Sequence, residues 1–286
     1  MARKTSFYYS FLVLPPEQRR AIIAVWDFCR AVDDAVDEPA DSTIDYPITQ
    51  LPDYPIQPAE RAVSFWRSEL ERVFDCSAQS MPLTRQGKHL QPFIRPFDLP
   101  RRAFEDVIDG VAMDLDRTSY ETFEALLEYC RRVASAVGLI CIRIFGCRSE
   151  GARDYALNLG IALQLTNILR DVRDDLNRDR VYLPLADLDS CGCTIADLRT
   201  GIVSEPVRRL MAYECARARA FYTRAAEALP VEDRKRLVAA EIMRAVYFAT
   251  LQRIERRGYD VFSSRVRVPK PQQALIALRQ WLWLPA

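Results

Sequence analysis

The sequence predicts an all-α protein, a single-domain helical bundle over residues 1–286. The chain holds only nine glycines, and Ala, Leu, Arg and Glu are its most frequent residues, a composition typical of helices. Apolar residues recur at helical spacing, whereas convincing alternating strands and internal repeats are absent. A hydrophobic content of 49% suffices for one large core, and proline-rich stretches separate helices without a composition shift. We therefore predict one domain.

The first predicted helix opens at Pro15-Pro16-Glu17, since proline suits the first helical turn, and continues to about Glu38. Five prolines and no apolar period make residues 39–58 a loop. A helix over 59–75 and an irregular stretch over 76–99 follow. The remaining predicted helices span 100–114, 120–146, 150–177, 204–228, 231–257 and 271–284.

Composition excludes several function classes. A net charge of +1 gives no electrostatic reason to expect nucleic acid as a partner. The eight cysteines are scattered, and the closest pair, Cys191-Gly-Cys193, has neither zinc nor thioredoxin spacing, so we expect reduced thiols. The apolar segment 7–14 lacks a small-residue cleavage site, and no run of roughly 18 apolar residues occurs. We expect a cytoplasmic protein without a spanning helix.

Two acidic clusters about 135 residues apart carry most of the functional information, and both lie in helical sequence. Residues four apart share a helix face, which aligns Asp33 with Asp37 and, in the second cluster, Asn167 with Asp171 and Asp175. Because like charges at this spacing destabilise a bare helix, two such stripes suggest a bound cation. Both stripes continue apolar helix faces, which favours an interior site over a solvated surface. Mg²⁺, which combines few carboxylates with substrate phosphates, is the natural candidate.

Other site chemistries fit poorly. Neither cluster has the glycine and terminal glutamate of an EF-hand. Di-iron bundles and histidine-dependent nucleophiles need more than the single histidine, His89, which lies in a segment predicted to be irregular. No glycine-rich phosphate loop is present. If phosphate binds here, metal and arginine must hold it.

At this point the sequence resembles the squalene/phytoene synthase family. The resemblance covers nearly the whole chain: residues 6–15 resemble the opening segment, 29–37 the first aspartate motif, 129–138 the helix bordering the lipid cavity, and 164–184 the second aspartate motif with its loop. Within the family, the opening 6–16 and the ending 258–271 look like bacterial presqualene diphosphate synthases of the hopanoid pathway. Residues 110–114 read as much like phytoene synthases.

The resemblance implies an isoprenoid synthase-type helical bundle around a central cavity, and it implies a set of site residues. The metal ligands would be Asp33, Asp37, Asn167, Asp171 and Asp175, holding two or three Mg²⁺ ions with bound diphosphate, and Tyr129 joins the four aspartates as a catalytic residue. Asp34 is a weaker ligand, and Asp174 is expected to pair with Arg170. The implied substrate-binding residues, which contact phosphate or line the cavity, are Ser6, Phe7, Phe11, Arg30, Val133, Val137, Gln164, Arg170, Arg180, Tyr182 and Tyr247.

The implied reaction is Mg²⁺-dependent head-to-head condensation of two farnesyl diphosphates to presqualene diphosphate, without NADPH. A downstream enzyme would then take the product. Phytoene, dehydrosqualene or squalene synthase activity on the same scaffold stays open, as does a catalytically dead assembly-factor relative. For Val133 and Val137, plain helix packing is the alternative to lining the cavity. The aromatic end, Trp281-Leu-Trp283-Leu-Pro-Ala, either packs on the core or makes peripheral contact with a membrane.

Overall fold

The computed structural model describes residues 8–37, 58–75, 77 and 80–283, and every regular element in these ranges is a helix. One isolated parallel bridge joins Ser119 to Val181. The elements are α1 (Tyr8–Leu12), α2 (Pro16–Asp37), α3 (Pro58–Asp75), α4 (Arg85–Ile94), α5 (Arg101–Asp116), α6 (Phe123–Cys130), η2 (Arg131–Ser135), α7 (Ala136–Ile144), α8 (Glu150–Leu176), α9 (Leu185–Ser190), α10 (Ile195–Arg199), α11 (Glu205–Ala228), α12 (Val238–Arg256) and α13 (Lys270–Trp283). The all-α fold predicted from the sequence is confirmed.

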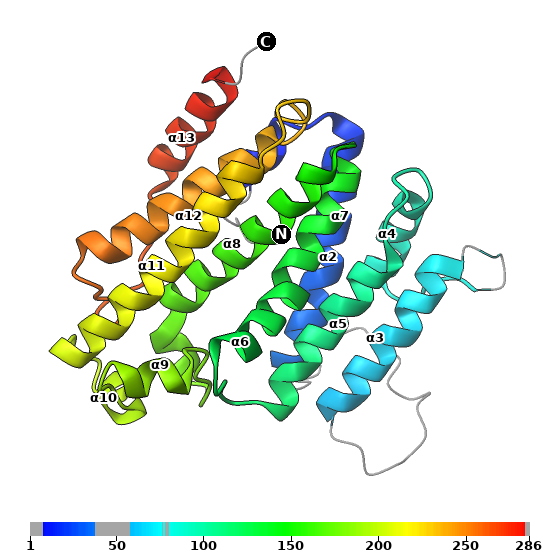
Figure 1. Cartoon of the computed structure of the whole chain (residues 1–286). Helices are drawn as coiled ribbons and strands as arrows, with labels where there is room; N and C mark the ends of the chain where they lie inside the picture. The colour runs from blue at the N-terminus through cyan, green and yellow to red at the C-terminus, as the bar shows by residue number, and fades with distance from the viewer. Residues whose placement is uncertain (1–7, 38–57, 76, 78–79, 284–286) are drawn as a thin grey trace.

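Helix α8 is the centre of the bundle and packs against α6, η2, α7, α11 and α12 (Figure 1). It begins at Ser149, whose hydroxyl accepts a hydrogen bond from the Ala152 backbone N–H. Asp233 fixes this start from a distant turn, because its carboxylate accepts bonds from the Arg148 and Ser149 backbone N–H groups at 3.0 Å. The second acidic stripe is thus carried on a helix that has a fixed start and packs against five other described helices.

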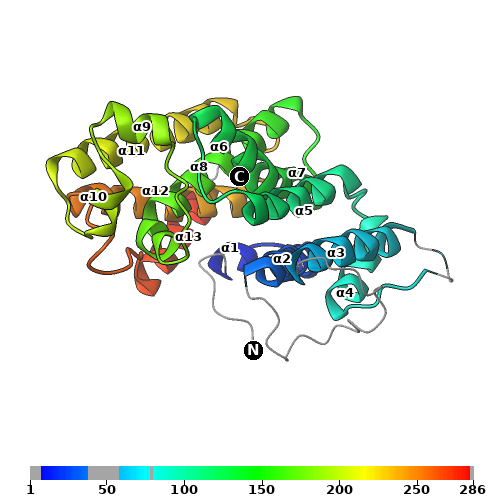
Figure 2. The same cartoon turned by 90° about the horizontal axis from the view of Figure 1, so that it is seen from below.

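The N-terminal half forms a layer of its own, in which α2, α3 and α4 lie beside α5 and α7 (Figure 2). Aromatic side chains join these helices: the Phe28 ring meets Trp66 edge-on at 5.1 Å and Phe104 at 5.8 Å. All three side chains are fully buried. This packing sets α2, with the first acidic stripe, against α5 and opposite α8.

A single turn of π-helix, η2, interrupts the long helix that the sequence predicts over 120–146. Glycines let neighbouring helices approach it: a Cβ built at Gly160 of α8 would lie 2.6 Å from the Ser135 Cα, and one at Gly110 of α5 would lie 2.7 Å from a Val133 methyl. π turns often occur at functional sites. Here the turn is clamped between two helices.

The structure corrects three other element predictions. Helix α4 lies inside the stretch 76–99 predicted to be irregular, since buried Glu69 of α3 accepts hydrogen bonds from the Thr84 backbone N–H and hydroxyl, both at 2.7 Å. Helix α12 begins only at Val238, after a run of turns from 231. Short helices α9 and α10 occupy the gap left after 177. None of the described helices is both long enough and apolar enough to cross a bilayer.

Candidate active site

A cavity of about 540 Å³ lies between α2, α5, α7, α8 and α12. Its two ends differ in chemistry. One end gathers carboxylates, arginines and amides, and the other is apolar. Such a volume is in the range of pockets that bind small molecules. Most residues that the resemblance assigns to the site, from both acidic clusters and from 129–138, line this space.

The polar end is built on the second acidic stripe of α8. Gln164, Asn167, Asp171 and Asp175 all line the cavity, as the four-residue spacing predicts for the last three. Asp171 receives a hydrogen bond from Arg170 Nε at 2.9 Å, and its Oδ1 lies 3.0 Å from a terminal nitrogen of Arg265. The Asp171 carboxylate is thus held by two guanidinium groups.

Two features of this stripe indicate that a cation beside it would be favourable. Burial, reinforced by the neighbouring Asp171 carboxylate, raises the pKa of Asp175 to about 7. The Asn167 side-chain oxygen is buried and makes no hydrogen bond within the described part of the chain. Buried acceptors are rarely left without a partner. A cation between these groups would meet both needs.

Helix α2 contributes the opposite rim. Asp33 and Arg30 line the cavity, and the Arg30 Nε lies 3.3 Å from Asp34. Asp33 is solvent-exposed, so the prediction that it extends an interior face is wrong: it lies at the cavity's mouth. Asp37 is the last residue of α2, and its side chain lies outside the described residues, as does all of the segment with Ser6 and Phe7.

The loop after α8 turns back toward the same end of the cavity. Asp179 adopts a left-handed backbone conformation with φ of 56°, which reverses the chain so that Arg178 and Arg180 both line the cavity. Beyond the turn, the backbone N–H of Val181 donates to the Thr118 carbonyl at 2.7 Å. This pairing holds the loop in place and directs Tyr182 inward.

Two tyrosines meet a shared carboxylate at the cavity wall. The Tyr129 and Tyr182 hydroxyls donate to different oxygens of Asp114, at 3.0 and 2.9 Å. Their rings stack with centroids 5.3 Å apart. Burial, with the Asp114 charge beside it, raises the pKa of both phenols well above the usual range. The phenols therefore stay neutral and keep their protons, which they donate in hydrogen bonds to the Asp114 carboxylate.

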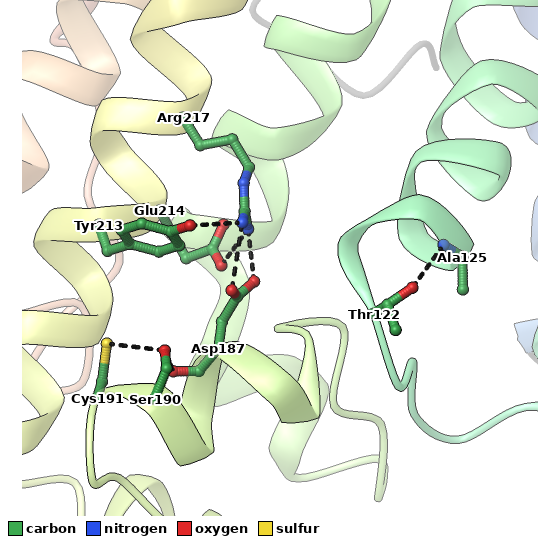
Figure 3. Close-up of polar contacts among 8 residues, drawn as sticks. All are labelled: Thr122, Ala125, Asp187, Ser190, Cys191, Tyr213, Glu214 and Arg217. Carbon is green, nitrogen blue, oxygen red and sulfur yellow. Dashed lines mark hydrogen bonds and ion pairs between the residues drawn. The ribbon is translucent and has the colours of Figure 1, made fainter.

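An ionic cluster outside the cavity anchors the segments that carry these tyrosines (Figure 3). Arg217 of α11 donates to Asp187 of α9 at 2.6 Å and to Glu214 at 2.6 Å, and its guanidinium lies 4.1 Å from the centre of the Phe123 ring at the start of α6. Burial is the main cause that raises the pKa of Glu214 to about 8. One side chain thus ties α9 and α6 to α11.

The other end of the cavity is apolar. It is lined from α2, η2, α7, α8, α12 and the residues next to them by aliphatic, aromatic and thiol side chains. Burial raises the pKa of the Cys29 and Cys141 thiols to about 12, which keeps them neutral. The residues are Cys29, Val133, Ala134, Val137, Cys141, Ile142, Phe145, Leu159, Leu163, Leu237, Ala240 and Met243.

The structure brings most of the predicted site residues together. Asp33, Asn167, Asp171 and Asp175 line one cavity with Tyr129 and with the described substrate-binding candidates Phe11, Arg30, Val133, Val137, Gln164, Arg170, Arg180, Tyr182 and Tyr247.

One predicted pair is wrong: Asp174 is exposed, and Arg170 pairs with Asp171. Sequence reasoning also missed Arg178 and the role of Arg265, because only the turn at Asp179 and the return of the C-terminal segment bring them here. Asp114 could have been recognised in the sequence as a candidate site residue, since it continues the apolar face of its helix.

The comparisons with known proteins point to one family. The family model described as squalene/phytoene synthase matches residues 1–272. A 15-cis-phytoene synthase of Synechocystis sp. is 33% identical, covering 97% of this chain and 80% of that protein. A presqualene diphosphate synthase of Rhodopseudomonas palustris is also 33% identical, covering 98% of this chain and 94% of that protein.

Solved structures show the same fold. The crystal structure of squalene synthase HpnC from Alicyclobacillus acidocaldarius matches with a TM-score of 0.74 and 31% identity, over 89% of each chain. A dehydrosqualene synthase solved in complex with a ligand matches with a TM-score of 0.79 over 98% of this chain and 91% of that one. At 24% identity, the latter likeness speaks for the fold alone.

Proposed function

The chain belongs to the squalene/phytoene synthase family of prenyltransferases, which condense isoprenoid diphosphates head to head, and from this premise we propose that it converts two farnesyl diphosphates to presqualene diphosphate. Diphosphate is released, Mg²⁺ is required, and NADPH is not. A separate downstream enzyme takes the product. The observation that carries the proposal is the polarity of the cavity, with acidic and basic groups at one end and an apolar wall at the other.

Mg²⁺ fits the donor set at the polar end. Asp33, Asn167, Asp171 and Asp175 offer only oxygen ligands, and the Asn167 oxygen has no hydrogen-bond partner among the described residues. No three His, Cys, Asp or Glu side chains cluster closely enough for a metal cage in the part of the chain that the structure describes. That pattern suits Mg²⁺, which takes one or two carboxylates and fills its other positions with water and phosphate. When bound, Mg²⁺ would neutralise the diphosphate leaving group.

Arginine side chains at the polar end of the cavity provide further contacts to diphosphate. Arg178, Arg180 and Arg265 surround the polar end, where they can bind diphosphate oxygens. Departure of the diphosphate breaks the C1–O bond of the first substrate and leaves an allylic cation. The double bond of the second substrate attacks that cation, and loss of one proton closes the cyclopropane ring.

The apolar wall excludes water from the cation until the ring has closed. The stacked rings of Tyr129 and Tyr182 can stabilise positive charge, and Asp114 fixes their orientation. The chain's only histidine, His89, is not among the cavity-lining residues. We therefore assign the base to the released diphosphate.

Phytoene synthase activity is the second candidate, because relatives of that name match this chain as well as the presqualene diphosphate synthase does. The two reactions differ in substrate length and in whether the cyclopropyl diphosphate ionises again. The deciding experiment incubates the purified chain with Mg²⁺ and either the C15 or the C20 diphosphate, with and without NADPH. We expect a product from the C15 substrate that still carries diphosphate and is unchanged by NADPH. Phytoene from the C20 substrate, or squalene, would replace the proposal, and no product from either would favour a non-enzymatic relative.

Removing one carboxylate tests the metal site directly. Asp171→Asn should lower turnover at least about a thousandfold, because it weakens a contact worth several kcal/mol at the leaving group. Chelation of Mg²⁺ should have the same effect on the wild type and be reversed by adding Mg²⁺. Asp174→Asn, on the exposed side of the same helix, is the matched control and should keep near-normal turnover. Equal losses in both variants would argue against a site on the α8 stripe.

A further inference from the structure

Helix α13 presents its large apolar side chains to solvent. Leu275, Leu278, Trp281 and Leu282 are each between 50% and 64% exposed. The opposite face, which packs against the protein, buries Gln273 and the small Ala277. The large apolar residues of α13 therefore point outward, whereas a surface helix of a globular protein usually turns them toward the core. Such a patch marks a surface with an apolar partner.

The exposed side chains form one continuous strip. At about 100° per residue, Leu275, Leu278 and Leu282 lie within about 60° of one another, and Trp281 extends the strip by a further 60°. The buried side is fixed independently, because the Gln273 side-chain amide donates to the Val268 carbonyl at 2.8 Å. The polar group of this buried residue is therefore satisfied within its own segment, and the leucines lie on the opposite face.

The segment that contains α13 also carries charges of one sign only. Residues 261–286 contain four basic residues and no acidic one, which leaves 36 basic and 39 acidic residues in the first 260. Arg267 and Lys270, just before and at the start of α13, are exposed, and Arg279 flanks the apolar strip. A strip of Leu and Trp bordered by Lys and Arg is the pattern of a helix that lies in the plane of a membrane surface.

We infer that the outward face of α13 docks onto the surface of an anionic phospholipid bilayer. The apolar strip enters the boundary between headgroups and acyl chains, and the basic residues meet lipid phosphates. A second copy of the chain fits less well, since a twofold contact through α13 would bring two identical basic segments together. The inference stands on this surface and not on the proposed reaction.

The position of α13 gives the docking a consequence for access to the cavity. α13 packs against α1 and α12, and both of those helices contribute to the cavity wall through Phe11, Met243 and Tyr247 (Figure 1). Arg265, five residues before α13, lies at the polar end of the cavity. Docking therefore places the membrane against the outer side of one cavity wall.

The test is sedimentation of the purified full-length chain with vesicles of phosphatidylcholine, alone or mixed with phosphatidylglycerol. We expect binding to the mixed vesicles and weaker binding to phosphatidylcholine alone. Leu278→Gln with Leu282→Gln should lower the partition coefficient about tenfold or more, because two buried apolar side chains are lost. Arg267→Gln and Lys270→Gln should each lower binding to the anionic vesicles about fivefold.

The matched control replaces two exposed apolar residues far from α13 in sequence, Ile202→Gln with Val231→Gln, which should bind like the wild type. Thermal unfolding of all variants should match the wild type, since none of these side chains packs in the core. Absence of wild-type binding to anionic vesicles, or an equal loss in the control, would overturn the inference. A wild-type dimer in light scattering that Leu278→Gln with Leu282→Gln dissociates, without vesicle binding, would reassign the face to a contact between copies.

Discussion

At the scale of single residues, the role of Asp114 depends on two partners that the sequence does not place beside it. Its two oxygens accept from Tyr129 and Tyr182, residues that are 53 positions apart in the numbering and reach the cavity from different elements. One carboxylate thus sets the orientation of two rings at the wall where a cation would form. The aspartate motifs were recognisable because four-residue spacing follows from helix geometry, whereas no spacing rule links Asp114 to its partners.

Asp114→Asn should lower kcat about 100-fold with little effect on the free energy of unfolding, because an amide cannot accept both hydroxyl bonds and the rings lose their fixed orientation. Steady-state kinetics and urea denaturation measure the two effects. The control is Asp116→Asn, an exposed residue at the end of the same helix, which should leave both unchanged. A kcat near that of the wild type in Asp114→Asn would show that the tyrosines do not need this carboxylate.

At the scale of elements, the close approach of α8 and η2 holds the cavity wall together. Gly160→Ala should destabilise the chain by about 3 kcal/mol, since the new methyl would meet Ser135 backbone atoms that belong to a clamped turn and cannot move aside. Chemical denaturation measures the loss. Gly151→Ala on the same helix has its nearest neighbour, the Ala228 carbonyl oxygen, at 3.2 Å and should stay within about 1 kcal/mol of the wild type. Similar stabilities for the two variants would mean that the turn yields.

The anchor between α9 and α11 should make stability depend on pH. The Glu214 pKa is about 8 in the folded chain against an ordinary 4.5, so the folded state keeps a proton that the unfolded state has released. Stability from this group is therefore lost as pH rises from about 5 to about 8. Glu214→Gln removes the titration, and its unfolding free energy should fall less over that range than that of the wild type. Glu227→Gln, exposed on the same helix, should keep the wild-type slope, and an unchanged slope in Glu214→Gln would refute the assignment.

At the scale of the whole molecule, the main helices and the aligned acids of α8 followed from the sequence, but the complete set of groups at the polar end of the cavity did not. Apolar periodicity and proline positions predicted α2, α3, α5, α8, α11 and α13, because these helices carry their own signals. Helix α4 depends on Glu69, fourteen or more residues away, and the return of Arg178 and Arg265 depends on a turn and on tertiary packing. Long-range contacts of this kind leave no local pattern.

Ligand binding should stabilise the chain as a unit, because the polar end draws on α2, α8, the loop after α8 and the C-terminal segment. Mg²⁺ together with inorganic diphosphate should raise Tm by about 5 °C when both are well above their dissociation constants. Each alone should do much less, since the carboxylates need the cation and the arginines need the anion. Scanning calorimetry with and without each component measures this. An equal rise with diphosphate alone would mean that the arginines suffice and would count against the metal site.

The π turn changes the direction in which the side chains of this helix point around its axis. Tyr129, Val133, Val137, Cys141 and Phe145 recur at every fourth position, and all five line the cavity. In an unbroken α-helix each step of four advances about 40° around the axis, so the fifth side chain would lie about 160° from the first. A five-residue π turn, with about 4.4 residues per turn, removes more than half of that drift. One wider turn thus keeps all five side chains on the cavity side of the helix, whereas an unbroken α-helix would carry the fifth to the far side.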